Sequence, residues 1–316
     1  MRRALAARDL AQVFRLLRKV GVSQRAIAAA TGLAPSEVYE ILRGRRVMAY
    51  EVRLLHAEAT HALRRQLHIT LADLHNLAGW TSLDVGLYRP ARRHFAEAIT
   101  QARQAGEPSL LANVIYRTGR LHLHRGLTVH ALRFFQLGQI AARDAADPLA
   151  VAVLSANEAW AYGMLGDSAQ AVGCLHRARE EHARAEPATA APWVRFFGPA
   201  DLDASTGMVH LGLAAADAPA ADLSTARETL TASLAARGSD MARSRAFELT
   251  ALATVCLRDH DPGEGIPLAR QVAELVGELR SVRVIDRLAP LIDQLAATPG
   301  TDAAGLARQL SAAGAR

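Results

Sequence analysis

The feature that most constrains the fold is an internal repeat. The stretches 76–99, 116–140 and 157–180 superpose so that a small residue is followed by glycine, then alanine, then a large apolar residue, always at the same offsets. The four columns, each with a period of 40 along the chain, are Gly79, Gly119 and Ala159; Gly86, Gly126 and Gly166; Ala91, Ala131 and Ala171; and Phe95, Phe135 and Leu175. Self-similarity at a fixed period is typical of arrays in which each unit packs only on its neighbours.

The hydrophobic pattern predicts an all-α protein. Apolar residues recur at intervals of three and four, as in 132–142 and 270–279, and alternating runs rich in Val, Ile and Thr are absent. Two looser helix pairs are expected at 201–236 and 240–278, with an insertion near 214–222. We expect 281–297 to form a closing cap helix, and the tail after it to be either a further short helix or frayed.

The repeat resembles the tetratricopeptide repeat (TPR), a helix–turn–helix pair. In that family the small residue lets the two helices approach closely, the glycine permits a tight turn, and the alanine and the large apolar residue pack into the next helix. The resemblance implies an α-solenoid of about five helix pairs plus the cap helix. Because 40 exceeds the family's usual period of 34, either the second helices or the loops between repeats must be longer. The family's early Trp-x-x-Leu signature is not reproduced.

The charge is concentrated at the N-terminal end. The chain has 37 basic and 31 acidic residues, a net charge of +6. Residues 1–50 contain ten basic and three acidic residues (10 − 3 = +7), so the remainder carries 27 − 28 = −1. This asymmetry favours a small module that contacts a polyanion, joined to a nearly neutral body. The alternative is a solvated basic arm.

Within this basic segment, residues 19–46 resemble the helix–turn–helix of the repressor and Cro superfamily, the XRE type. The resemblance lies in Gln24, Ala28, Gly32, Val38 and Ile41 and their spacing. It implies that Gln24 contacts phosphate and that one face of the second helix reads the major groove, with arginines on the flanking phosphates. The implied DNA-binding residues are Gln24, Arg25, Pro35, Ser36, Glu37, Tyr39, Glu40, Arg43, Arg45 and Arg46. Alternatively, the arginines are a solvated helix end and the two glutamates pair with them.

We therefore expect four segments: a DNA-binding head at 1–50, a connecting helix at 51–68, a TPR-like sensor and dimerisation array at 69–297, and a C-terminal tail at 298–316. Repressor-type heads normally add one or two further helices. Here either 49–66 supplies the closing helix, or a shortened head is joined rigidly to the array.

The whole chain resembles actinobacterial regulators that join an XRE head to divergent TPRs, on stretches such as LADLHNLAGW, FQLGQI and RSVRVIDRLAPL. The peptide-pheromone receptors of Firmicutes share only the architecture. Membership implies a cytoplasmic, homodimeric transcription factor that binds double-stranded DNA and senses a small-molecule or peptide effector. The rival interpretation is a TPR adaptor that binds a protein or peptide and keeps a vestigial head.

The concave face of such an array predicts a ligand groove. Counting from Ala72, Ala112 and Ala152, the groove-facing positions include Asp73 and the candidate binding residues Asn76, Trp80, Asn113, Tyr116, Arg117, Arg120, Asn157 and Trp160. The asparagines would hold a peptide backbone, the arginines a carboxylate and the tryptophans an apolar body. Alternatively, the tryptophans are core and the arginines solvated. The aromatic segment 191–199 is either a lid on the groove or a plug in the solenoid.

Other chemistry is not expected. His61, His68 and His75 form one stripe, but neighbours two turns apart lie about 10 Å from each other, too far for one metal ion. No Walker loop, dinucleotide fingerprint or catalytic triad spacing occurs. We expect no catalytic residue, no metal, no cofactor and no membrane span, and the two distant cysteines predict no disulfide framework. A TPR-based enzyme or small-molecule carrier is the least favoured alternative.

Overall fold

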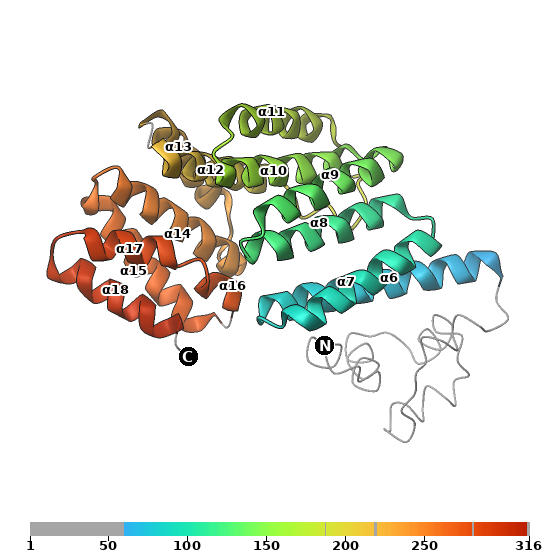
Figure 1. The fold of residues 1–316 in the computed structure, drawn as a ribbon, viewed down its shortest axis with the longest axis horizontal. Coiled ribbons are helices and arrows are strands. Elements are labelled where there is room, and N and C mark those ends of the chain that lie inside the picture. Colours follow the sequence, from blue (N-terminus) through green and yellow to red (C-terminus); the bar gives the residue numbers. More distant parts are fainter. Residues whose placement is uncertain (1–59, 187, 218–219, 280, 315–316) are drawn as a thin grey trace, which may run out of the picture.

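The computed structural model describes residues 60–186, 188–217, 220–279 and 281–314. Over these ranges the chain is an all-α solenoid of antiparallel helix pairs, as the periodicity predicts (Figure 1). The predicted head, with all ten DNA-contact residues, lies outside the described ranges. None of the described helices is both long enough and apolar enough to cross a membrane.

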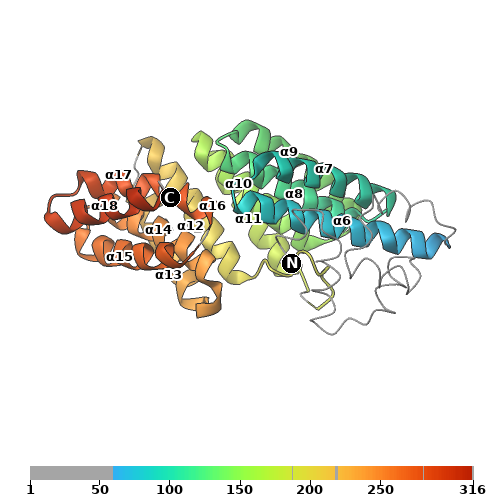
Figure 2. The same cartoon turned by 90° about the horizontal axis from the view of Figure 1, so that it is seen from below.

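Successive helices pair and the pairs stack (Figures 1 and 2). The first three pairs are α6 (His61–Asp84) with α7 (Tyr88–Gln104), α8 (Pro108–His124) with α9 (Thr128–Asp144), and α10 (Pro148–Leu165) with α11 (Ser168–Arg184). Next come α12 (Pro199–Asp217) with α13 (Ala220–Ala236) and, after a short 3₁₀ turn, α14 (Ala242–Arg258) with α15 (Pro262–Glu278). Helix α6 already begins at His61, so the described part of the predicted connecting helix continues into the first repeat without a break.

The turns explain the length of the period. Left-handed backbone recurs twice in every period, at Gly86, Gly106, Gly126, Ala146 and Gly166, with φ between 48° and 77°. Each of these residues follows the end of a helix, and the next amide reaches back to an orphan carbonyl, as from Leu127 to His122 at 3.0 Å. Helices of 17 residues such as α7, α8 and α9 alternate with short turns. The extra length relative to the usual repeat therefore lies in the helices and not in long loops.

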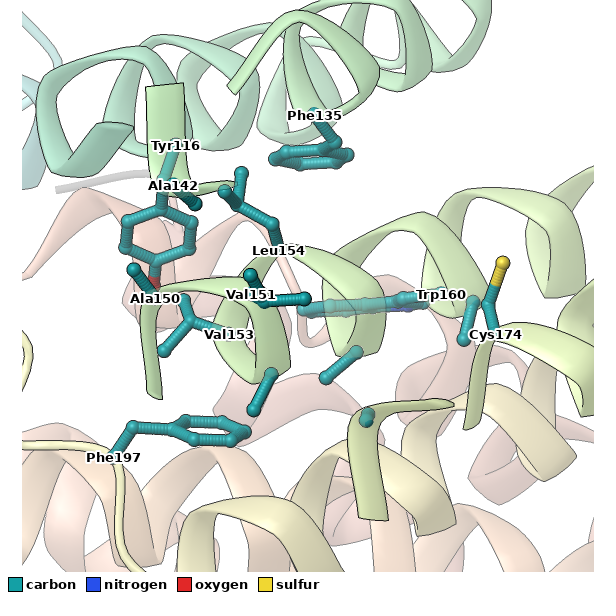
Figure 3. Packing of buried hydrophobic residues seen from close by; sticks show 14 of the residues in the cluster. Tyr116, Phe135, Ala142, Ala150, Val151, Val153, Leu154, Trp160, Cys174 and Phe197 are labelled. Atoms are coloured by element: carbon teal, nitrogen blue, oxygen red, sulfur yellow. The ribbon is translucent and has the colours of Figure 1, made fainter. Parts of the chain in front are cut away.

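The repeated columns form the contact between the two helices of a pair. A Cβ added at Gly79 would lie 2.7 Å from the ring of Phe95, and Gly119 meets Phe135 in the same way. In the third pair Ala159 faces the smaller Leu175, and all three large residues are at most 1% exposed. The contacts within the second and third pairs belong to one buried cluster that also includes the residues packed between these pairs. Figure 3 shows side chains of α10 lying between Tyr116 and Phe135 on one side and Phe197 on the other.

The later pairs keep more of the pattern than the sequence predicts. In the fifth pair Ala253 is followed by His260, whose φ of 57° places it at the turn position that glycine holds earlier. Gly265 and Ala269 then occupy the next two columns. In the fourth pair Gly207 contacts Leu230. Gly207 and Leu230 are 23 residues apart in sequence, whereas Gly79 and Phe95 are 16 apart, as are Ala253 and Ala269. Among the described pairs, the insertion therefore lies in the fourth.

The C-terminal region differs from the expected single cap helix. Residues 281–297 form a short α16 (Val282–Ile285) and a separate α17 (Ala289–Ala297), with a break at 286–288 and Pro290 in the first turn of α17. The segment after α17 forms α18 (Thr301–Gly314), which buries Leu306 and Leu310 in the C-terminal core. The tail is therefore helical through Gly314, and the cap of the solenoid is an α17–α18 pair.

Candidate functional site

The candidate site lies where the first helices of the early pairs meet α16. Position nine of those helices is Trp80, Arg120 and Trp160, so the solenoid stacks aromatic, cation and aromatic in neighbouring layers. The guanidinium of Arg120 lies 4.5 Å from the centre of the Trp160 ring. One turn earlier, Arg117 lies 5.3 Å from the centre of Trp80. The repeat itself thus places two of the predicted arginines against both predicted tryptophans.

The C-terminal segment adds two more arginines that the repeat pattern does not predict. Arg283 on α16 lies 4.3 Å from the centre of the Trp80 ring, and Arg287 lies 4.6 Å from that of Trp160. Both also lie within 5.7 Å of the centre of Phe247 on α14. Each tryptophan is therefore contacted by two guanidinium groups, one from α8 and one from the segment at α16. We call Arg117, Arg120, Arg283 and Arg287, with Trp80, Trp160 and Phe247, the arginine centre.

One buried carboxylate fixes this arrangement. Asp84, 4% exposed at the end of α6, accepts from Nε of Arg283 at 3.0 Å and pairs with Nη2 of Arg243 at 2.8 Å. The Oγ of Ser281 also donates to it at 3.0 Å. These contacts between distant parts of the sequence tie the first helix of the solenoid to α14 and α16. The i, i+4 spacing of Arg283 and Arg287 is a signal in the sequence, but nothing in the periodicity predicts that they lie against Trp80 and Trp160.

The predicted asparagines are engaged within the chain. Asn76 is fully buried and donates from Nδ2 to Oδ1 of Asn113 at 2.9 Å, while its own Oδ1 has no hydrogen-bond partner among the described residues. Asn157 donates to the carbonyl of Val153 in its own helix and accepts from Arg120 at 2.9 Å. Asn76 and Asn157 therefore position the first helices of the pairs and the arginines they carry.

Asn113 does hold a peptide backbone, but it is the chain's own. Its Nδ2 donates to the carbonyl of Trp193 at 2.9 Å, and Nε1 of Trp193 donates to Oγ of Ser109 at 2.9 Å. Phe197 is buried in the central core, as the plug interpretation predicts, whereas Phe196 is 44% exposed and stacks on Tyr116 with ring centres 6.0 Å apart. The segment between α11 and α12 thus covers the start of α8. The arginine centre lies toward the C-terminal end of α8, where Arg117 and Arg120 are.

All four arginines of the centre have a pKa below the ordinary value of arginine. Burial lowers the pKa of Arg117, Arg120 and Arg283. The pKa of Arg287 is lowered furthest, first by burial and then by repulsion from Arg120 and Arg283. Burial also raises the pKa of Asp73, although Arg117 opposes that shift. The groups gathered here are therefore cations that repel one another in a partly desolvated place.

The histidines are separately engaged. Nδ1 of His68 lies 2.7 Å from Oε1 of Gln101, and Nδ1 of His75 lies 3.0 Å from Nδ1 of His94. His124 pairs with Asp286 at 3.0 Å, just beyond α16. A cleft of about 600 Å³ lies elsewhere, between the α14–α15 turn and the end of α17, and contains none of the predicted ligand residues.

The fold and the centre together define an all-α repeat protein in which arginines and aromatic rings gather where the first helices of the early pairs meet α16. No protein-family model matches the chain, and no curated protein matches it.

Proposed function

We propose that this chain is a ligand-responsive DNA-binding regulator, in which the basic head at 1–50 binds double-stranded DNA and the solenoid senses an effector and mediates homodimerisation. The head rests on the +7 charge of its sequence and on its resemblance to the XRE helix–turn–helix. The single structural observation that supports a sensing role is the arginine centre, because it is assembled from both ends of the solenoid. A ligand bound there contacts α8 and the α16 segment at once.

The contact between Asp84 and Arg283 gives this proposal a route to the head. Helix α6 is the described element nearest the head in sequence, and its C-terminal end is held by α16 and α14. A ligand that competes for Arg283 changes the restraint on α6. A ligand can shift the equilibrium between the paired and unpaired states of Asp84 and Arg283 if it binds one of these states better than the other.

DNA binding is tested with duplexes selected from a random library, measured by gel shift at two salt concentrations. We expect steep salt dependence for the wild type, and loss of binding when Arg43, Arg45 and Arg46 are all replaced by alanine. The matched control removes the same charge from the solenoid by replacing Arg89, Arg92 and Arg93, which lie on or beside the outer face of α7. If the head variant binds DNA as tightly as the control, the proposal is wrong.

The adaptor remains the second candidate, and one observation favours it. The solenoid already binds a peptide carbonyl from a non-helical segment, since Asn113 donates to the carbonyl of Trp193. A groove that binds its own segment in this way is suited to bind a partner peptide. An adaptor predicts no selected duplex in the library experiment and capture of a peptide that displaces segment 188–198, measured as increased hydrogen exchange there.

A further inference from the structure

The arginine centre holds more positive charge than the chain itself neutralises. Arg283 and Arg243 share Asp84, and Asp73 lies near Arg117. Among the described residues, the hydrogen bond of Arg120 goes to the neutral amide of Asn157. Among the ion pairs of the described residues none includes Arg287, whose guanidinium lies against the rings of Trp160 and Phe247.

The nearby acids do not offset this excess. Asp286 is adjacent in sequence to Arg287, but its carboxylate accepts from the hydroxyl of Tyr88 at 3.1 Å and pairs with His124. Counting the four arginines of the centre and also Arg243, which shares Asp84, against Asp73 and Asp84 leaves 5 − 2 = +3. Counting Asp286 as well leaves +2. A centre with this balance lacks a partner of about two negative charges.

Bringing these cations together costs stability. Like charges in a partly desolvated place repel one another, which is why repulsion from Arg120 and Arg283 adds to burial in lowering the pKa of Arg287. Packing on aromatic rings offsets part of this cost but neutralises no charge. An arrangement that violates local electrostatics without a compensating ion pair is expected where a ligand supplies the missing charge.

We propose that the arginine centre binds a phosphate-bearing small molecule, with the phosphoryl group held between Arg120, Arg283 and Arg287. A phosphate monoester carries close to two negative charges and three acceptor oxygens on one group, and guanidinium groups bind it through paired N–H donors. A single carboxylate supplies half of the charge. The aromatic rings fix the guanidinium planes, so the donors are oriented before the ligand arrives. This inference rests on the sensing role proposed above and specifies its effector class.

The test is calorimetric titration of the full chain with inorganic pyrophosphate at constant ionic strength. We expect binding by the wild type and a dissociation constant at least about tenfold larger for Arg287→Met, because methionine keeps the contact with the rings but removes the charge. Arg133→Met removes one arginine from α9, away from the centre, and is expected to bind as the wild type does. Absence of pyrophosphate binding, or equal binding by Arg287→Met, overturns the proposal. Malonate binding as tightly as pyrophosphate overturns the assignment to phosphate.

Thermal unfolding without added anion separates a binding role from a structural one. If the charge of Arg287 is kept for a ligand, Arg287→Met has a melting temperature equal to or above that of the wild type, because a repelling cation is gone. A lower melting temperature with unchanged pyrophosphate affinity shows that Arg287 is structural and overturns the proposal. Neither measurement contains DNA, so loss of DNA binding with intact pyrophosphate binding counts against the regulator proposal alone.

Discussion

The ring of Phe95 lies directly against the backbone of Gly79, so that a Cβ at residue 79 would stand 2.7 Å from two ring carbons. Gly119 and Phe135 repeat this relationship in the second pair. In the third pair both partners change together, to Ala159 and Leu175. The small residue and the large residue of a pair therefore complement each other in volume, and this packing sets the distance between the two helices.

We predict that Gly79→Ala destabilises the solenoid by about 1–3 kcal/mol, because overpacking forces the ring or the backbone to move. This sign is opposite to the usual effect of glycine to alanine inside a helix. The measurement is the free energy of unfolding from urea denaturation. Gly173→Ala in α11 is the matched control, since an added Cβ there meets nothing within 4 Å. It is expected to stabilise by up to about 1 kcal/mol. A neutral or stabilising Gly79→Ala refutes the packing argument.

The turns make a second prediction. Ala146 adopts φ 48° at the position where the preceding repeat has Gly106 at φ 59°. Alanine in left-handed backbone costs about 1 kcal/mol, so Ala146→Gly is expected to raise the free energy of unfolding by roughly that amount. The reverse change, Gly106→Ala, is expected to lower it similarly, because a Cβ there meets no neighbour and only the backbone cost applies. Shifts of the same sign in both variants contradict this interpretation.

Asp84 makes the third prediction. Asp84→Ala leaves Arg283 buried without its carboxylate, and breaking such a pair costs about 3–5 kcal/mol. We expect a lower melting temperature together with faster hydrogen exchange in α16, because Ser281 and Arg283 both lose their acceptor. Asp302→Ala is the control. Asp302 and its partner Arg270 are both exposed, with Nη2 and Oδ2 3.5 Å apart. The free energy of unfolding is therefore expected to change by no more than about 0.5 kcal/mol. Unchanged hydrogen exchange in α16 refutes the claim that Asp84 holds α16 in place.

Glu158 makes a pH prediction. Burial raises the pKa of its carboxyl above the usual 4.5, so the folded chain binds this proton more tightly than the unfolded chain. The stability contributed by this group is therefore present below pH 4.5 and lost as pH rises through the folded pKa. Glu158→Gln is expected to be more stable than the wild type near neutral pH and to lose that advantage below pH 4.5. The new amide can also donate to Oε1 of Gln139, which is buried without a partner among the described residues. Equal stability at all pH values contradicts this.

The two cysteines make the last prediction. Both are buried, and burial raises the pKa of each thiol, for Cys174 and for Cys256, to about 11. Relative to the ordinary value of 9.0, this lowers the thiolate fraction at pH 8 about a hundredfold. We expect iodoacetamide to label the native chain very slowly and the urea-unfolded chain rapidly, as followed by mass spectrometry. Rapid labelling of native Cys174 means that α10 and α11 separate readily.

The repeat makes much of the solenoid predictable. The columns that include Gly86 and Phe95 report turn and packing geometry directly, because only glycine enters left-handed backbone without strain and only a small residue fits against a ring. The fifth pair looks irregular in sequence because His260 occupies a glycine position, a substitution that only the backbone angle reveals. The break at 286–288 is not predictable in this way, because 281–297 retains helical periodicity across it.

Part of the candidate site could likewise be predicted from the repeat, and part could not. Trp80, Arg117, Arg120 and Trp160 can be placed together from the period alone, because residues one period apart occupy neighbouring layers of a stacked array. Asn113 is predicted to hold the backbone of a ligand, whereas in the structure its amide donates to the carbonyl of Trp193 in the chain itself, a partner that the period does not predict.

By itself, the sequence determined the helix-pair repeat and the basic N-terminal segment, since both depend on spacing and charge along the chain. Only the tertiary structure decided that Arg283 and Arg287 lie against Trp80 and Trp160 and that Asp84 holds the first of them there. Contacts between residues so far apart in sequence depend on the summed curvature of every intervening pair. No local pattern encodes that sum.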